Sequence, residues 1–350
     1  MRARLVRILV ASLVTLVLIE GGVRLRQWWR YGTTVTSYYR FSNDPKTGLR
    51  IPEPGHSVGP ITVNSLGFRG AEIEVPKPPG RVRLAFLGAS TTFCAEASSL
   101  AATWPDLVVS GLRTSEPGLE FDYVNGAAGG FTVAQSLVNL EQRVAPLEPD
   151  VVVYYEATND LTVDTRRLAI EAGLYEPEED SKLGEWWLTY FLLEKNLRQL
   201  RRGHGESPKL AFEPHALSRG FEERLTRFVQ RAQELSPVVA LVTFSIQMRA
   251  GHTPEQARAA AASALYYMPF LDVPALLAGY AEYNQVTRTV AQATGAIMIE
   301  GEDLIPGDPE HFADSVHFRD PGLRLQAERI LAGLRAAPAF RSLLDRARVH

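Results

Sequence analysis

The chain has 350 residues, 45% of them hydrophobic and 22% charged, which is the composition of a globular protein with one large domain or two small ones. Its formal net charge of −3 excludes the strongly basic surface typical of nucleic-acid-binding proteins, so no nucleic acid is expected as a partner. The single cysteine, Cys94, excludes an internal disulfide.

The first 31 residues have the pattern of a membrane segment. Three arginines precede an uncharged apolar run from Ile8 to Ile19, which is shorter than the ~20 residues of a spanning helix. A spanning helix must therefore extend beyond this run, and we predict that it reaches from about Leu5 to Leu25. The arginines near its two ends would extend their side chains to the membrane interfaces. No small-x-small cleavage site follows, which favours an uncleaved signal-anchor over a cleaved signal peptide, and a soluble amphipathic helix is the remaining alternative. The arginines before the run favour a cytoplasmic N-terminus and a periplasmic or extracytoplasmic domain, whereas three arginines after it oppose that orientation.

Residues 32–80 are rich in proline, glycine and polar residues, and we interpret them as a tether and pre-domain segment. Within this segment, residues 63–70 (ValAsnSerLeuGlyPheArgGly) have spaced apolar side chains, so they are expected to pack on the core. The run from Pro76 to Gly80 closes the segment, which places the main domain at residues 81–340.

The main domain alternates between apolar runs typical of buried strands and amphipathic runs typical of helices. The predicted strands are 82–87, 121–125, 150–155, 238–244 and 296–300, and the predicted helices are 104–112, 133–144, 221–235, 280–293 and 323–334. Regular alternation predicts a central parallel sheet of about five strands with helices on both faces. Insertions at about 162–218 and 247–278 interrupt the pattern after strand ends, and such insertions tend to be lids or substrate-binding elements.

Ser90 follows the first predicted strand, on the turn into a helix. That position lies at the carboxyl edge of the sheet, where open α/β folds bind ligands. The Ser-Thr-Thr run is also good helix-capping chemistry, so from this stretch alone Ser90 is either a cap or a functional residue.

Three further groups of polar or small residues are predicted at the same edge. Gly129 and Gly130 follow the second strand, Asn159 and Asp160 follow the third, and Asp314 and His317 precede the last helix. Each pair alone is typical of a turn, a loop or a surface coincidence.

Together these residues supply what acyl transfer requires. Ser90 is a nucleophile that needs a base, His317 can take its proton, and Asp314 can hold the imidazole tautomer. The N–H groups of Ser90 and Gly130 and the side-chain amide of Asn159 can surround a tetrahedral oxyanion.

In these residues the chain resembles the SGNH (GDSL-type) hydrolases. The resemblance covers about residues 60–335. The four blocks of that family occur in order, as GlyAlaSerThrThr at 88–92, AsnGlyAlaAlaGlyGlyPheThr at 125–132, AlaThrAsnAsp at 157–160 and AspSerValHis at 314–317. Residues 63–70 are similar to the segment that precedes the first block in membrane-anchored bacterial members. The resemblance implies a flavodoxin-like three-layer α/β/α sandwich and the roles given above, with Gly130 favoured over Gly129.

Two positions depart from the family pattern. Ala89 stands where the family usually has the aspartate of Gly-Asp-Ser, and Ala157 stands where it usually has a glycine. The missing aspartate is not the triad acid, so we expect altered support around Ser90 and an intact mechanism.

The sequence thus predicts a membrane-anchored serine esterase that acts outside the cytoplasm on an acyl, in our expectation acetyl, ester of a carbohydrate or lipid. An O-acyltransferase that modifies an envelope polysaccharide and a catalytically degenerate binding protein are the alternatives. No cofactor is expected, and the spacings around His311 match no zinc pattern. Cys94 has no base of its own and is interpreted as a small buried residue.

Overall fold

The computed structural model describes residues 2–31, 40–176, 187–190, 192–194, 197 and 208–349. Parts of two predicted segments therefore lie outside the described residues: 32–39 of the tether, and most of 177–207 in the first insertion.

A five-stranded parallel sheet forms the centre of the domain. Its strands are β3 (Arg81–Gly88), β4 (Glu120–Asn125), β5 (Val151–Tyr155), β6 (Val238–Val242) and β7 (Ile297–Ile299). Their order is β4-β3-β5-β6-β7, which is the flavodoxin-like order and confirms the predicted fold class. All five predicted strands are present, with ends shifted by at most two residues.

The strands lie in the interior because most of their side chains are apolar, and burial removes those side chains from water. Every residue of β5 is buried, and Leu84 to Leu87 in β3 are fully inaccessible. Trp104 packs its ring edge-on against Phe86 and Tyr155, with ring centroids 5.1 and 6.1 Å apart.

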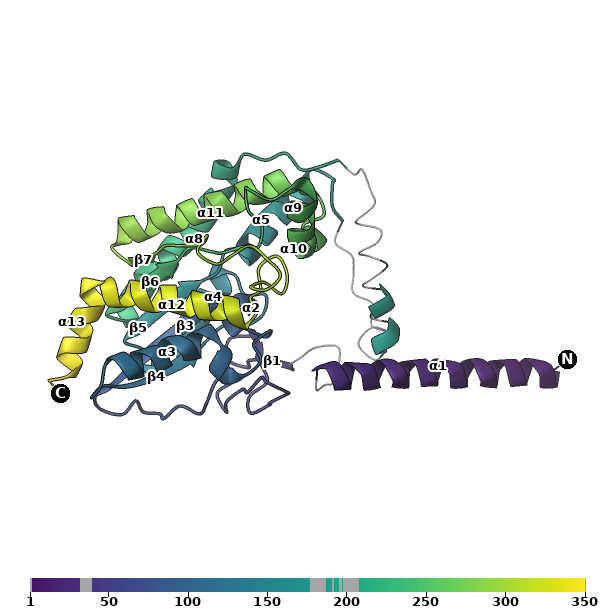
Figure 1. Ribbon diagram of the computed structural model, residues 1–350, viewed down its shortest axis with the longest axis horizontal. Helices are drawn as coiled ribbons and strands as arrows, with labels where there is room; N and C mark the ends of the chain where they lie inside the picture. Colours follow the sequence, from purple (N-terminus) through teal and green to yellow (C-terminus); the bar gives the residue numbers. More distant parts are fainter. Residues whose placement is uncertain are drawn as a thin grey trace.

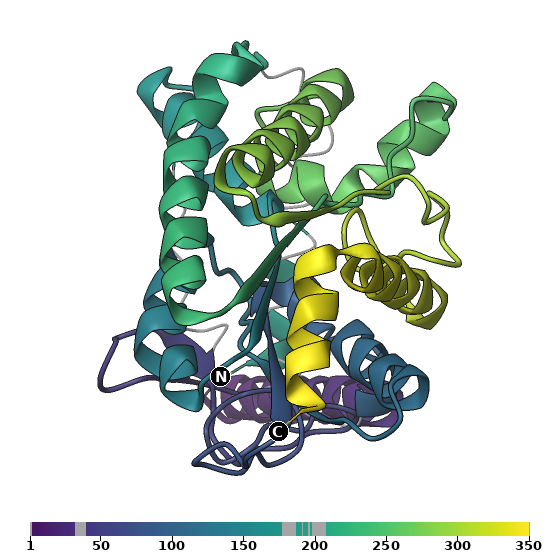
Figure 2. The same cartoon turned by 90° about the vertical axis from the view of Figure 1, so that its left-hand side faces the viewer.

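Helices cover both faces of the sheet, as Figures 1 and 2 show. One face carries α4 (Val133–Asn139), α5 (Thr158–Glu171), α8 (Pro214–Leu235) and α11 (Val273–Thr294), and the other carries α3 (Trp104–Ser115), α12 (Asp320–Ala336) and α13 (Pro338–Ala347). The helix expected over 133–144 divides at Asn139, because its last five residues form a π-helical turn, Leu140–Val144. Helices α5 and α13 were not predicted.

The N-terminal helix α1 (Arg2–Tyr31) extends away from this domain (Figure 1). Its stretch Val6–Arg26 has a mean hydropathy of 2.0, and is long and apolar enough to cross a membrane or to serve as a signal sequence. Trp28 and Trp29, near its end, are exposed.

The pre-domain segment is tied to the domain, as expected for residues 63–70. It contains the antiparallel pair β1 (Phe41–Asn43) and β2 (Arg50–Pro52), and Phe68 belongs to the main core. The Asn64 side chain accepts N–H groups from Leu66 and Phe68 and donates to Ala71, which closes the turn.

The two insertions have different surroundings. In the first, which lies between α5 and α8, the backbone N–H groups of Leu188 and Thr189 donate to Glu20 of α1 at 3.0 and 2.9 Å. The second folds into α9 (Pro254–Ala260) and α10 (Ala262–Tyr267).

Candidate active site

Three strand ends converge at the carboxyl edge of the sheet. In the strand register Phe86 of β3 pairs with Asn125 at the end of β4, and Gly88 pairs with Tyr155 at the end of β5. The segments that follow, which carry Ser90, Gly130 and Asn159, therefore start side by side. The chain reverses its direction across the sheet at β3, which is where open α/β folds form a ligand crevice.

The turn that presents Ser90 requires a glycine. Gly88 has φ +147°, and a Cβ atom there would lie 2.2 Å from the carbonyl oxygen of Tyr155. Only a glycine lets β3 approach β5 so closely and then turn into the short helix α2 (Ser90–Phe93). The Thr92 hydroxyl donates to the same Tyr155 oxygen at 3.0 Å and fixes this helix on the sheet.

Ser90, His317 and Asp314 form a continuous hydrogen-bonded chain. The Oγ atom of Ser90 lies 2.8 Å from Nε2 of His317, and Nδ1 of His317 lies 2.8 Å from Oδ2 of Asp314. Oδ1 of Asp314 accepts the backbone N–H groups of Val316 and His317, both at 2.9 Å. This tight turn lets an aspartate three residues before the histidine reach its ring, as the spacing had suggested.

The charges around His317 favour its protonated form. Burial alone would lower the pKa of His317, but the carboxylates of Glu96, Asp314 and Glu156 outweigh burial and raise the pKa to about 9. Burial would likewise raise the pKa of Asp314, but the His317 ring and the two backbone N–H groups lower it to about 2. Asp314 is therefore a carboxylate throughout the neutral range, facing an imidazole that holds a proton readily.

Hydrogen-bond donors lie on the segments next to Ser90. In the part of the chain that the structure describes, the N–H groups of Ser90 and Gly130 donate to no other residue. Gly130 has φ +85° and open space around it. The side-chain nitrogen of Asn159 donates one N–H to the carbonyl of Phe131 at 2.9 Å, which orients the amide and leaves its second N–H for a ligand.

Two buried side chains hold the donor segments together. Asn125, which is 2% exposed, donates to Thr92 of the Ser90 helix at 3.0 Å and accepts the N–H of Ala127 at 3.2 Å. Asp160 accepts the N–H of Val133, which starts α4 directly after the Gly130 loop, at 2.8 Å. Hydrogen bonds from side chains within the sequence blocks thus hold the segments after the strand ends together.

Arg69 connects the pre-domain segment to the same helix. Its guanidinium, buried at 1% exposure, donates to the carbonyls of Phe93 and Cys94, where α2 ends. Arg69 thus adds side-chain donors at the carbonyl end of α2 and ties the Ser90 helix to the pre-domain segment. Cys94 is itself buried, and burial raises its thiol pKa to about 12, which agrees with the prediction of a small buried residue.

Residues 86–325 match the model of the GDSL-like lipase/acylhydrolase family. The chain belongs to this family. It is a carboxylic ester hydrolase by that membership, as the sequence blocks had indicated. No curated protein matches the chain significantly.

Several solved structures of this kind are similar to the chain at low identity. An acetylxylan esterase from Geobacillus stearothermophilus is 18% identical, with a TM-score of 0.44 over 72% of this chain and 93% of that one. A lipase/acylhydrolase from Enterococcus faecalis is 16% identical, with a TM-score of 0.43 over 73% and 96%. An α/β hydrolase from the Lake Arreo metagenome is 15% identical, with a TM-score of 0.43 over 72% and 94%.

The departure from the family pattern at Ala89 has a structural explanation. Ala89 is fully buried in a small apolar cluster with Leu49, Ile51, Ala128 and Phe131. Two of these side chains come from the pre-domain segment, so that segment covers the position where the family usually has an aspartate. An ionised aspartate there would lose its hydration without an ionic partner. Ala157, the other departure, is buried directly before α5.

Glu156 is a buried acid near the site that the sequence analysis did not single out. Its Oε1 accepts the backbone N–H of Asn159 at 2.6 Å, and its Oε2 has no hydrogen-bond partner among the described residues. Burial, only partly offset by that N–H, raises the pKa of Glu156 to about 8. Its position directly after an apolar strand could have indicated its importance from the sequence. A carboxyl group buried at such a position either has a function or destabilises the fold.

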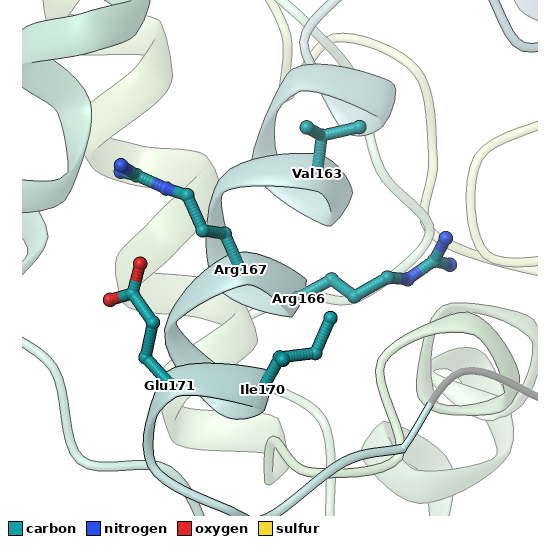
Figure 3. A pocket seen from close by; sticks show the side chains of 5 residues that line it. All are labelled: Val163, Arg166, Arg167, Ile170 and Glu171. Atoms are coloured by element: carbon teal, nitrogen blue, oxygen red, sulfur yellow. The ribbon is translucent and has the colours of Figure 1, made fainter.

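A separate hollow of about 400 Å³ lies on the outer surface of α5 (Figure 3). It is lined by Val163, Arg166, Arg167, Ile170 and Glu171, none of which is a nucleophile or an imidazole. The strand-end crevice therefore remains the candidate active site. No group of three or more His, Cys, Asp or Glu among the described residues could hold a metal ion.

Proposed function

We propose that the chain is an SGNH-type serine esterase in which Ser90 is the nucleophile, His317 the general base and acid, and Asp314 the residue that orients His317. The observation that carries this proposal is the hydrogen-bonded chain from Ser90 through His317 to Asp314, with spacings of 2.8 and 2.8 Å. It lies at the ligand-binding edge of the sheet, beside N–H groups that no other described residue uses.

The mechanism follows from this arrangement. Nε2 of His317 takes the proton from Ser90 Oγ as that oxygen attacks the ester carbonyl. The N–H groups of Ser90 and Gly130 and the free amide hydrogen of Asn159 stabilise the oxyanion, and each such donor contributes about 10²–10³ to turnover. His317 then gives its proton to the departing alkoxide, and the acyl group stays on Ser90. Water resolves the acyl-enzyme, with His317 again as base, and releases the carboxylic acid.

Exposure of the site supports water as the second nucleophile. Ser90 is only half-buried, and the side chains of His317 and Asp314 are 20% and 34% exposed. A transferase must exclude water from its acyl-enzyme, whereas these three described side chains are accessible to water to this extent. We therefore favour hydrolysis over transfer to a polysaccharide.

The N-terminal helix supports a membrane-anchored enzyme. Val6–Arg26 is long and apolar enough to span a bilayer, and exposed tryptophans follow it, as at a membrane interface. We propose that α1 anchors the chain and that the catalytic domain faces the periplasmic or extracytoplasmic side. Alkylation of introduced cysteines by an impermeant reagent in whole cells tests this orientation, since a cytoplasmic domain would not react.

The test of the proposed activity is hydrolysis of p-nitrophenyl acetate, butyrate and octanoate by the full chain in detergent. We expect Ser90-dependent release, with Ser90→Ala reduced to background. Ser65→Ala, at an exposed serine of the pre-domain segment, is the matched control and should retain activity. Release that survives Ser90→Ala would contradict the proposal. Appearance of an acetylated sugar when an oligosaccharide is added would show transfer in place of hydrolysis.

A further inference from the structure

Glu156 directly follows β5 and lies three residues before Asn159. It is 3% exposed, although glutamate is almost never fully buried unless its carboxylate is paired. Its Oε1 accepts the backbone N–H of Asn159 at 2.6 Å, whereas its Oε2 has no hydrogen-bond partner among the described residues. A buried oxygen without a partner costs stability, so the presence of this carboxyl group is better explained by a role in the site than by packing.

The first turn of α5, which carries Asn159, lacks a side-chain cap at the usual position. The residue before the helix is Ala157, whose methyl group accepts no hydrogen bond. The first N–H groups of a helix have no carbonyl partner within it, so they need an acceptor from outside. Glu156 supplies that acceptor from one residue further back, and it thereby fixes the backbone of Asn159 relative to the end of β5.

The side chain of Asn159 is held by a second contact. Its amide donates one N–H to the carbonyl of Phe131 at 2.9 Å, and Phe131 follows the other proposed oxyanion donor, Gly130. The contact of Glu156 with the backbone and the contact of Phe131 with the side chain together set the direction of the second amide N–H. Loss of the first contact would free the backbone, and that direction would no longer be fixed.

We propose that Glu156 is a positioning residue for ester hydrolysis, which holds Asn159 so that its free amide hydrogen points at the oxyanion. The inference rests on the proposed esterase function and adds to it a residue that acts through Asn159. An oxyanion donor stabilises the transition state more than it stabilises the bound ester. Displacement of Asn159 should therefore lower kcat and leave KM nearly unchanged.

The test compares Glu156→Leu with Glu156→Gln in the full chain, with acetate release from ethyl acetate as the assay. Leucine removes the acceptor, whereas glutamine keeps an acceptor oxygen for Asn159 and puts its nitrogen at the place of Oε2, which has no described partner to lose. The charge of Glu156 also acts on His317, but both variants lack that charge, so the difference between them reports the hydrogen bond. Glu156→Met is the second apolar variant if Glu156→Leu does not fold.

We expect kcat of Glu156→Leu to lie about 10–100-fold below that of Glu156→Gln at similar KM, because displacement of a donor costs less than the 10²–10³-fold typical of its removal. Asn159→Ala removes the donor itself, so in that background Glu156→Leu should lower kcat by less than about twofold more than Glu156→Gln does. Glu213→Leu is the matched control, since Glu213 likewise accepts N–H groups at the start of a helix, α8, and kcat should not change.

Failure of this inference is distinguishable from failure of the esterase proposal. Ser90-dependent hydrolysis with equal kcat for Glu156→Leu and Glu156→Gln would overturn the positioning role and leave the esterase intact. A full further loss in the Asn159→Ala background would also overturn it, since Glu156 would then act independently of Asn159. If no ester is hydrolysed, hydrogen exchange of the Asn159 backbone amide tests the contact by itself. Faster exchange in Glu156→Leu alone would support the role, and equal exchange in both variants and the unsubstituted chain would overturn it.

Discussion

Replacement of Glu96 by glutamine tests how the charges around His317 set the pH at which the enzyme works. Burial lowers the pKa of His317, but the charge of Glu96, the hydrogen bond and charge of Asp314, and the charge of Glu156 oppose burial, and the result is a pKa of about 9. Glu96 is exposed and makes no hydrogen bond to the triad, so its replacement changes charge with little effect on packing.

The expected magnitude follows from the fraction of neutral imidazole. With a pKa of about 9, about 1% of His317 is neutral at pH 7, so kcat/KM should rise about tenfold per pH unit up to about pH 9. Glu96→Gln removes a negative charge and lowers this pKa. Each unit by which it falls increases kcat/KM at pH 7 about tenfold, until the neutral form predominates.

The assay is acetate release from ethyl acetate between pH 5.5 and pH 10, since this product is detected equally well throughout that range. We expect the rising limb of Glu96→Gln to lie at lower pH than that of the unsubstituted chain. Glu120→Gln, at the opposite end of the sheet, is the control, and its pH profile should superimpose on that of the unsubstituted chain. A rising limb of kcat/KM centred near pH 6.5 in the unsubstituted chain would refute this electrostatic account. Identical pH profiles for Glu96→Gln and the unsubstituted chain would also refute it.

Three further substitutions test individual parts of the site. Asp314→Asn should lower kcat by about 10³–10⁴-fold, because the variant loses the carboxylate that orients the imidazole. Asp308→Asn, in the similar Asp308–His311 turn, is the control and should leave kcat unchanged. Both variants are assayed by ester hydrolysis. Ala89→Asp should destabilise the fold by about 2–5 kcal/mol, since it places a carboxyl in an apolar cluster, and a chemical-denaturation curve unchanged by it would contradict that packing. Gly88→Ala should cost at least about 2 kcal/mol, because its Cβ would overlap a carbonyl oxygen of β5; an unchanged unfolding temperature would show that the turn relaxes.

The fold could be predicted from the sequence because its strands are continuous apolar runs. β3, β5 and β6 are buried on both faces, and such runs are readable without knowledge of their partners. Helix α5 was harder to predict, because its first turn, from Thr158 to Asp160, has the composition of a loop. There Glu156, two residues before the helix, accepts the Asn159 N–H in place of a standard cap. The short spacing between Asp314 and His317 made their contact predictable, because a three-residue turn brings the two side chains together.

The supporting contacts could not be predicted, because they join segments far apart in the chain. Nothing local shows that Arg69 reaches the end of the Ser90 helix, or that Leu49 and Ile51 cover Ala89. The same holds for the hydrogen bonds that fix α10 to Ser315, between Asp314 and His317. These contacts depend on how the tether and the second insertion fold back on the sheet, which residue patterns do not encode locally. The catalytic roles of Ser90, Gly130, Asn159, Asp314 and His317 remain predictions until activity is measured.

The most direct test of the central claim is to locate the nucleophile. A fluorophosphonate reacts only with a serine that a nearby base activates, and peptide mass spectrometry then identifies the modified residue. The account predicts a single adduct on Ser90 in the full chain, and loss of that adduct in His317→Gln but not in His311→Gln. An adduct on another residue, or labelling of Ser90 that persists in His317→Gln, would contradict it.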